Sequence, residues 1–382
     1  MERNVARLPE PAEAGGRNLL IYGAPEASPD LFHAIPVGIG DPFLYAEVDG
    51  RRIATPSVLD GDKVAALGVE ILDPSTLGAD ALFGQGLGRH EVSLEVALRA
   101  CREIGLARAA VPPEFPLAVA DHLRAGGIVL DVDPEVFITR RRHKTDAQLD
   151  GIRRAQKAAD AAMGVAATLI RELRPGLTSE AVRDAMAAVC DEHGCDLPGD
   201  VIVAHGAQSA DGHESGFGAL AAGEPVVVDI WPRDRASRCW ADMTRTFAAG
   251  GGEPDAELAE YWRLTRESLD RVYPAVRAGA DGAEIFRLSC EPYIEAGKPT
   301  QLTKAEGEVL RDGYFHGLGH GVGLEIHESP GLGRASDPLM AGDVITLEPG
   351  CYRQGYGGCR LEDLVIVTAD GCDTLTDFPY DL

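Results

Sequence analysis

Two short stretches of the sequence decide the fold: GEPVVVD at residues 223–229 and GDVITLE at residues 342–348. Each starts at a glycine, continues as an apolar run and ends on a carboxylate, which is the pattern of a buried strand with an acid at its end. A second acid follows 13 residues later in the first copy and 14 residues later in the second, at Asp242 and Glu362. The sequence therefore predicts one strand-forming unit in two copies, each with a pair of carboxylates.

Helical patterns repeat together with these strands. An amphipathic stretch that opens at Asp146 is followed by a second from about 179 to 193, and a similar pair starts at Asp255, 109 residues further on. Because such a period indicates an internal duplication, residues 144–382 are expected to form one domain with pseudo-twofold symmetry. Residues 1–143 mix short apolar runs with helical stretches and are expected to form a smaller α/β domain.

Composition and charge exclude several classes of function. The 382-residue chain carries 36 basic and 61 acidic residues and a net charge of −25, so its average field repels nucleic acids and anionic membranes, and neither is expected as a partner. The absence of any stretch of 18 apolar residues, and of a signal-peptide core in the first seven residues, predicts a cytoplasmic protein. The one basic run, RRRHK at residues 140–144, is expected to be a solvated interdomain segment.

The four acids require a positive partner if they converge. Burying an unpaired carboxylate costs several kcal/mol, on the order of 3–5 kcal/mol, and four of them at matched positions of a repeat would also repel one another. Two divalent cations satisfy four carboxylates better than scattered arginines do. The remaining ligand should be an imidazole, and residues 316–327, HGLGHGVGLEIH, supply three candidate histidines. The glycines of this segment allow the backbone to approach a site closely.

The sequence lacks the motifs of two other classes of hydrolase. Neither His213-Glu214 nor His327-Glu328 is followed by the second histidine of the zincin motif H-E-x-x-H. Ser215 stands one position too late for the G-x-S-x-G nucleophile elbow. Neither a zincin nor a serine hydrolase is therefore expected.

This constellation resembles the pita-bread metallopeptidases, the group that contains Xaa-Pro dipeptidase (prolidase), aminopeptidase P, creatinase and methionine aminopeptidase. The resemblance is strong over residues 144–382, whereas residues 1–143 match by size and general character. It implies an α+β fold, with a creatinase/prolidase-like N-terminal α/β domain followed by a catalytic pita-bread domain. The two-domain layout is similar to that of the prolidase and aminopeptidase P branch.

The resemblance also implies a role for each site residue. Five residues would hold a dinuclear metal centre, namely Asp229, Asp242, His320, Glu348 and Glu362. Four would contact the substrate, namely His213, His316, His327 and Arg360. Among these, Glu348 would act as the general base, and His327 and His213 would assist catalysis. His205 lies too far ahead of Asp229 to match a family histidine.

The activity implied is metal-dependent hydrolysis of Xaa-Pro bonds, by an Xaa-Pro dipeptidase or an Xaa-Pro aminopeptidase. The cofactors would be two divalent ions, with Mn²⁺ preferred and Co²⁺ or Zn²⁺ as alternatives, since the ligands are mostly oxygen. The substrate would be a small peptide and the assembly a homodimer.

One departure from the family pattern leaves a second function open. The spacing between Asp229 and Asp242 is two residues longer than usual, and Asp229-Ile230-Trp231-Pro232-Arg233 replaces the usual D-x-G opening. The alternative is therefore a lyase or hydrolase of the same fold that acts on a small non-peptide molecule. A pseudoenzyme that binds a partner protein is disfavoured, because all five ligands are present.

Overall fold

The computed structural model describes residues 17–381 and divides the chain into two compact units, with the boundary between Arg141 and Arg142. The N-terminal residues on which the signal-peptide prediction rests lie outside the described part. Among the helices described, none is both long enough and apolar enough to cross a membrane. Each unit mixes helices and strands, which confirms the predicted α+β class.

The first unit contains one six-stranded mixed sheet with the strand order β4-β3-β2-β1-β5-β6. Its strands are β1 (Leu19–Gly23), β2 (Phe43–Val48), β3 (Arg51–Ala54), β4 (Glu70–Ile71), β5 (Arg108–Val111) and β6 (Val129–Val132). Its helices are α1 (Pro29–Ala34), α2 (Gly61–Ala65), α3 (Ala79–Gly84), α4 (Arg89–Glu103), α5 (Leu117–Ala125) and α6 (Pro134–Arg142), the last of which ends at the unit boundary.

Both faces of this sheet are buried, and the alternation of side chains along the strands explains how. In β1, Leu20 belongs to the apolar cluster that includes residues of α4 and α5, whereas Leu19 and Ile21 belong to the cluster that includes residues of α1. Successive residues of a strand point to opposite faces, so an uninterrupted apolar strand requires cover on both sides. The expected α/β character of this part of the chain follows from that pattern.

The second unit repeats one order of elements, two helices followed by strands. The first copy contains α7 (Asp146–Glu172), α8 (Ser179–Glu192), β7 (Cys195–Asp196), β8 (Ile202–His205), the 3₁₀ helix η1 (Gly206–Ala210), β9 (Pro225–Ile230), β10 (Arg233–Asp234) and β11 (Met243–Ala248). The second contains α9 (Ala256–Val272), the 3₁₀ helix η2 (Tyr273–Ala275), α10 (Gly282–Glu295), β12 (Gly319–Gly321), β13 (Glu328–Leu332), β14 (Val344–Leu347), β15 (Gly350–Arg353), β16 (Gly357–Arg360), β17 (Asp363–Val367) and β18 (Cys372–Thr374). The predicted duplication is therefore present in the order of the elements.

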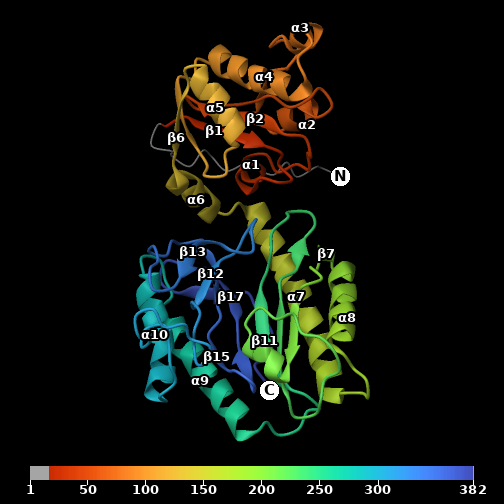
Figure 1. Ribbon diagram of the computed structural model, residues 1–382, viewed down its shortest axis with the longest axis vertical. Coiled ribbons are helices and arrows are strands. Elements are labelled where there is room, and N and C mark those ends of the chain that lie inside the picture. The colour runs from red at the N-terminus through yellow and green to blue at the C-terminus, as the bar shows by residue number, and fades with distance from the viewer. Residues whose placement is uncertain (1–16, 382) are drawn as a thin grey trace. The chain divides into compact units, whose positions relative to one another are not determined.

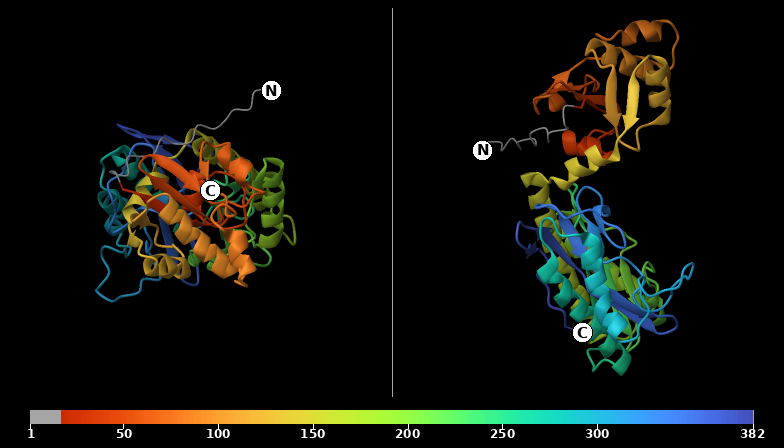
Figure 2. Two further views of the ribbon diagram at one scale, coloured as in Figure 1. Left: turned by 90° about the horizontal axis from the view of Figure 1, so that it is seen from above. Right: turned by 90° about the vertical axis from the view of Figure 1, so that its left-hand side faces the viewer.

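The strands of this unit lie between the two helix pairs. In Figure 1, α7 and α8 lie on one side of the strands and α9 and α10 on the other. The right-hand view of Figure 2 shows α9 and α10, coloured teal to cyan, packed side by side in front of the strands. The strands form a three-stranded sheet, β11-β9-β8, a five-stranded sheet, β13-β12-β14-β17-β18, and the hairpin β15-β16.

Helix α7 begins at a capping box, which leads to a stability prediction. The Thr145 hydroxyl accepts a hydrogen bond from the Gln148 amide at 3.2 Å, and the Gln148 side chain accepts one from the Thr145 amide at 2.9 Å. We expect Thr145→Ala to lower the free energy of unfolding by about 1 kcal/mol, since the Gln148 amide loses the hydroxyl that accepts its hydrogen bond. Thr168→Ala, on the exposed face of the same helix, is the control and should change stability little.

The three tryptophans provide the measurement, because Trp231, Trp240 and Trp262 all lie in the second unit. Denaturant unfolding followed by their fluorescence therefore reports on that unit alone. Equal stability of the Thr145→Ala and Thr168→Ala variants would mean that the capping box contributes nothing.

The prediction of a solvated segment at residues 140–144 is wrong. Arg140 donates to both oxygens of Glu47 in the first unit, and Arg142 donates to both oxygens of Asp343 in the second. Lys144 pairs with Glu328, and both side chains are almost fully buried. These acids lie between 93 and 201 residues away in the sequence, so the local composition gave no sign of them.

Candidate metal centre

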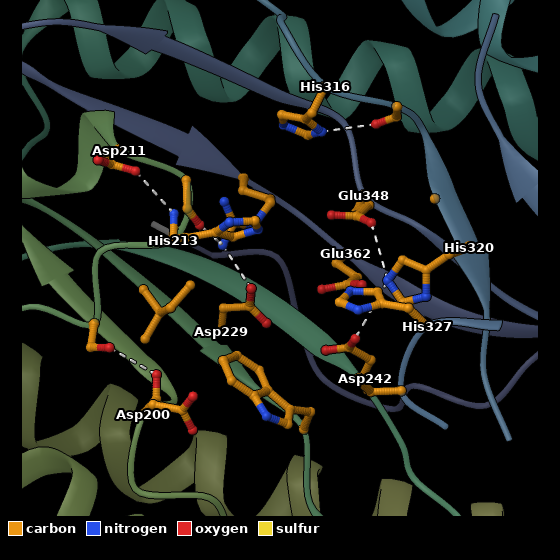
Figure 3. A pocket seen from close by; sticks show the side chains of 18 of the residues that line it. Asp200, Asp211, His213, Asp229, Asp242, His316, His320, His327, Glu348 and Glu362 are labelled. Atoms are coloured by element: carbon orange, nitrogen blue, oxygen red, sulfur yellow. Dashed lines mark hydrogen bonds and ion pairs between the residues drawn. The ribbon is translucent and has the colours of Figure 1, made fainter. Parts of the chain in front are cut away.

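A cavity of about 630 Å³ in the second unit is lined by all nine residues that the sequence singled out. Figure 3 shows Asp242, Glu348 and Glu362 gathered with the imidazoles of His320 and His327, whereas Asp229 and His213 lie to the left of this group and His316 lies above it. His205 is not among the lining residues. Its ring instead contacts Glu224 at 2.8 Å and the Phe217 carbonyl at 3.1 Å.

Strands and the residues next to them bring the five predicted ligands together. Asp229 lies within β9, Asp242 directly precedes β11, His320 lies in β12, Glu348 follows β14, and Glu362 lies between β16 and β17. The register of β9 with β11 is unbroken over six residue pairs, from Met243 opposite Ile230 to Ala248 opposite Pro225. The two additional residues of the 229–242 segment therefore lie outside this ladder.

The separation of the donor atoms fits a bound cation. One ligand atom each from Asp242, His320 and Glu362 can be chosen so that all three lie within 4.8 Å of one another. His320 Nε2 lies 3.8 Å from Asp242 Oδ2 and 3.4 Å from Glu348 Oε1. Asp229, the fifth predicted ligand, lies 2.7 Å from the guanidinium of Arg360.

The buried carboxylates of the cavity are close enough to repel one another, and a positive charge between them would stabilise them. Burial, together with the charges of neighbouring carboxylates, raises the pKa of Asp242 and of Glu362 well above their ordinary values. Burial first, and Asp229 in addition, raise the pKa of Glu348 to about 8, although Arg360 acts in the opposite direction. Within the described residues, Oδ1 of Asp229 and Oδ1 of Asp242 are buried without a hydrogen-bond partner. A divalent cation would compensate both the repulsion and the unsatisfied oxygens.

His320 is in the state that a metal ligand requires. Burial, and then the neighbouring His327, lower its pKa to about 4, so the ring is neutral at physiological pH. Its Nδ1 lies 3.2 Å from the Gly321 carbonyl and donates its proton there, which leaves the Nε2 lone pair facing Asp242 and Glu348. Four carboxylates and one neutral imidazole are a donor set that fits divalent cations.

The glycines beside His320 are required by close packing of the backbone. A Cβ atom on Gly319 would lie 2.1 Å from the Thr346 carbonyl oxygen, and one on Gly321 would lie 2.4 Å from that of Ser329. Side chains at these positions would displace β12 and the histidine it carries. The glycine-rich pattern around His320 thus has a direct structural cause.

Sequence reasoning missed several residues that hold the site together. Thr244 donates to Glu362 Oε2 at 2.7 Å and accepts from Arg360 Nε at 3.3 Å. The Tyr352 hydroxyl accepts from Arg360 Nη1 at 3.0 Å and lies 2.9 Å from Nε2 of His316. Thr244 could have been found, because it shares a strand face with Asp242. No pattern in the sequence pointed to Tyr352.

His316 and Arg360 are therefore joined through Tyr352. Burial and the charge of Arg360 lower the pKa of His316 to about 3, and its Nδ1 lies 2.8 Å from the Gly317 carbonyl. The neutral ring consequently donates from Nδ1 and accepts the Tyr352 proton at Nε2. Trp231 and Asp200 also line the cavity and were not predicted as site residues.

Comparison with known proteins identifies the family. The family model described as metallopeptidase family M24 matches residues 150–369, more than half of the chain. The chain belongs to this family. The M24 assignment confirms the metallopeptidase family inferred from the sequence, and it covers every residue of the proposed metal centre.

Individual members of the M24 family show how far the similarity extends. The chain is 30% identical over 275 residues to the probable dipeptidase PepE of Mycobacterium tuberculosis, covering 71% of this chain and 68% of that protein. It is 30% identical over 236 residues to the Xaa-Pro dipeptidase of Pyrococcus furiosus, covering 61% and 62%. Its structure is similar to that of the Xaa-Pro dipeptidase from Bacillus anthracis, with a TM-score of 0.78 at 25% identity over 97% of this chain and 95% of the other. This likeness confirms the pita-bread architecture and extends to the first unit.

Proposed function

We propose that this M24 protein is a metal-dependent peptidase that hydrolyses Xaa-Pro bonds, as an Xaa-Pro dipeptidase or aminopeptidase. The observation that carries the proposal is the convergence of Asp242, His320 and Glu362 within 4.8 Å in a cavity that the other predicted residues also line. The names of the relatives from Pyrococcus furiosus and Bacillus anthracis supply the substrate class.

In this proposal the metal centre is dinuclear and its ligands are Asp229, Asp242, His320, Glu348 and Glu362. Divalent ions at such a centre would supply Lewis-acid activation of a water and of the scissile carbonyl. Oxygen-rich coordination with one imidazole favours Mn²⁺, with Co²⁺ or Zn²⁺ as alternatives.

The protein's own groups would handle the proton and the substrate. Glu348, whose carboxyl has a pKa of about 8 in the absence of metal, would accept the proton of the attacking water at its carboxylate and pass it to the leaving nitrogen. His327 would donate a hydrogen bond to the oxyanion that develops on the scissile carbonyl. His213, His316 and Arg360 would hold the substrate, with Tyr352 fixing the latter two.

Preference for proline follows from the missing amide hydrogen. The nitrogen of an Xaa-Pro bond has no N–H, so a site shaped for it needs no acceptor at that point. An ordinary peptide would bring a donor that stays unpaired, at a cost of about 1 to 3 kcal/mol. The enzyme should therefore cleave Ala-Pro with a kcat/KM at least about tenfold above that for Ala-Ala.

A panel of four conditions tests the function: metal-free protein, and the same protein loaded with Mn²⁺, Co²⁺ or Zn²⁺. Each is assayed on Ala-Pro, Ala-Ala and the longer peptide Ala-Pro-Ala, which distinguishes a dipeptidase from an aminopeptidase. Chelated protein should be inactive, and added metal should restore cleavage of the proline substrates. Full activity in metal-free protein would reject the metal-dependent mechanism, and similar rates on Ala-Pro and Ala-Ala would reject the proline preference.

The alternative, a lyase or hydrolase acting on a small non-peptide molecule, has one specific observation in its favour. Trp231, from the longer segment between Asp229 and Asp242, lines the cavity, so the site differs from the family pattern where substrate binds. Metal-loaded protein that binds its metal but cleaves none of the three peptides would favour this function. The homodimer and the cytoplasmic location remain predictions.

A further inference from the structure

The two metal-ligand carboxylates Asp242 and Glu362 come from different halves of the duplicated unit and meet at a seam. Across it, the Glu362 amide donates to the Thr244 carbonyl at 3.0 Å, and the Thr244 hydroxyl donates to Glu362 Oε2 at 2.7 Å. A second threonine, Thr246, exchanges two hydrogen bonds with the backbone of Arg360. The relative position of the two ligands therefore depends on how firmly β11 is held against residues 360–363.

One buried arginine, Arg245, fastens this seam from the opposite face of β11. Its side chain is only 1% exposed. Its five N–H directions are matched by five acceptors between 2.7 and 2.9 Å away: the carbonyls of Thr244, Glu362, Phe378 and Pro379, and Oδ1 of Asp363. A guanidinium is the only side chain that presents five donors in a fixed plane. Two of these acceptors belong to residues whose side chains meet at the metal centre.

Two of these five acceptors, the carbonyls of Phe378 and Pro379, come from the C-terminal segment, which packs against the same place. The C-terminal clasp, residues 377–381, is held at several points besides Arg245. The Trp262 indole donates to the Tyr380 carbonyl at 2.8 Å, and the Tyr380 hydroxyl donates to Asp363. The guanidiniums of Arg245 and Arg266 both contact the Tyr380 ring, at 4.5 Å and 3.9 Å from its centroid. The clasp thereby keeps the plane of Arg245 fixed.

We infer that Arg245 and the C-terminal clasp are positioning elements that set the spacing of Asp242 and Glu362 and hence the affinity for metal. The inference rests on the proposed metal centre, but it concerns groups that contact neither metal nor substrate. Partners that orient ligands in this way typically contribute about 10- to 100-fold to metal affinity. Their loss should weaken metal binding even in protein that remains folded.

Two variants test this inference with Co²⁺ alone as the probe. Arg245→Lys keeps the charge but offers three donors from one point, so it cannot reach all five acceptors. A chain that ends at Asp377 keeps Arg245 and removes the Phe378 and Pro379 carbonyls. In protein shown to be folded by near-UV circular dichroism, titration calorimetry should give a Co²⁺ dissociation constant raised about 10- to 100-fold. The visible Co²⁺ spectrum should change as well, because the ligand geometry has changed.

Arg271→Lys is the matched control. Arg271 makes ion pairs with Glu267, Glu291 and Glu295 on α9 and α10, so the same substitution should lower the melting temperature without changing Co²⁺ affinity or spectrum. If Arg245→Lys does not fold, the shortened chain and Tyr380→Phe carry the test. Wild-type affinity and spectrum in every folded variant, or an equal loss in Arg271→Lys, would overturn the inference. A wild-type chain that binds no Co²⁺ would instead reject the proposed metal centre itself.

Discussion

Replacing Asp242 by asparagine should remove most of the bound metal and lower kcat/KM by at least about 100-fold. Asp242 is 5% exposed, its Oδ2 lies 3.8 Å from His320 Nε2, and its other oxygen is buried with no hydrogen-bond partner among residues 17–381. Asparagine has nearly the same shape but no charge, so a hard cation loses a ligand while the packing is kept. Glu362→Gln should behave in the same way from the other half of the repeat. Metal content by elemental analysis and activity on Ala-Pro measure both effects.

Stability distinguishes loss of a ligand from loss of the fold. In the absence of metal, Asp242→Asn removes one of several mutually repelling carboxylates, so the metal-free variant should melt at or above the temperature of the metal-free wild type. Added metal should raise the melting temperature of the wild type much more than that of the variant, because only the wild type binds it tightly. Unchanged metal stoichiometry in both Asp242→Asn and Glu362→Gln would show that the ligands have been misplaced.

The four carboxylates of the proposed metal centre were predictable because their signal is local and occurs twice. An acidic residue at the end of an apolar strand can be recognised in any short window of sequence. The duplication makes Asp229 equivalent to Glu348 and Asp242 equivalent to Glu362. Strand alternation also puts Thr244 on the same face as Asp242, although Thr244 was not among the predicted site residues. The cavity then contained all nine predicted site residues, although their individual roles remain proposals.

The network that holds these ligands was not predictable, because it depends on pairs that are distant in sequence. Arg245 reaches Asp363 and the Phe378 carbonyl, 118 and 133 residues away. The prediction for the basic run at residues 140–144 was wrong for the same reason, since Arg142 pairs with Asp343, which lies 201 residues away in the sequence. The sequence does not distinguish a buried arginine from a solvated one. Only the tertiary structure determines which carboxylate or carbonyl each arginine contacts.

His327→Ala should lower kcat by roughly 100-fold while changing KM little, since an oxyanion donor acts mainly in the transition state. The His327 ring packs edge-on against His320 at 4.3 Å between centroids and lines the cavity. Partial burial and the nearby His213 lower its pKa, so near neutral pH the ring is uncharged and keeps one N–H to donate.

His205→Ala is the control for this prediction. His205 is hydrogen-bonded to Glu224 and to the Phe217 carbonyl outside the cavity lining, so its replacement should leave kcat almost unchanged. Steady-state kinetics on Ala-Pro with metal-saturated protein separate the cases. A rise in KM at constant kcat would make His327 a binding residue, and a larger loss in His205→Ala than in His213→Ala would place the substrate histidine before β9 at the wrong position.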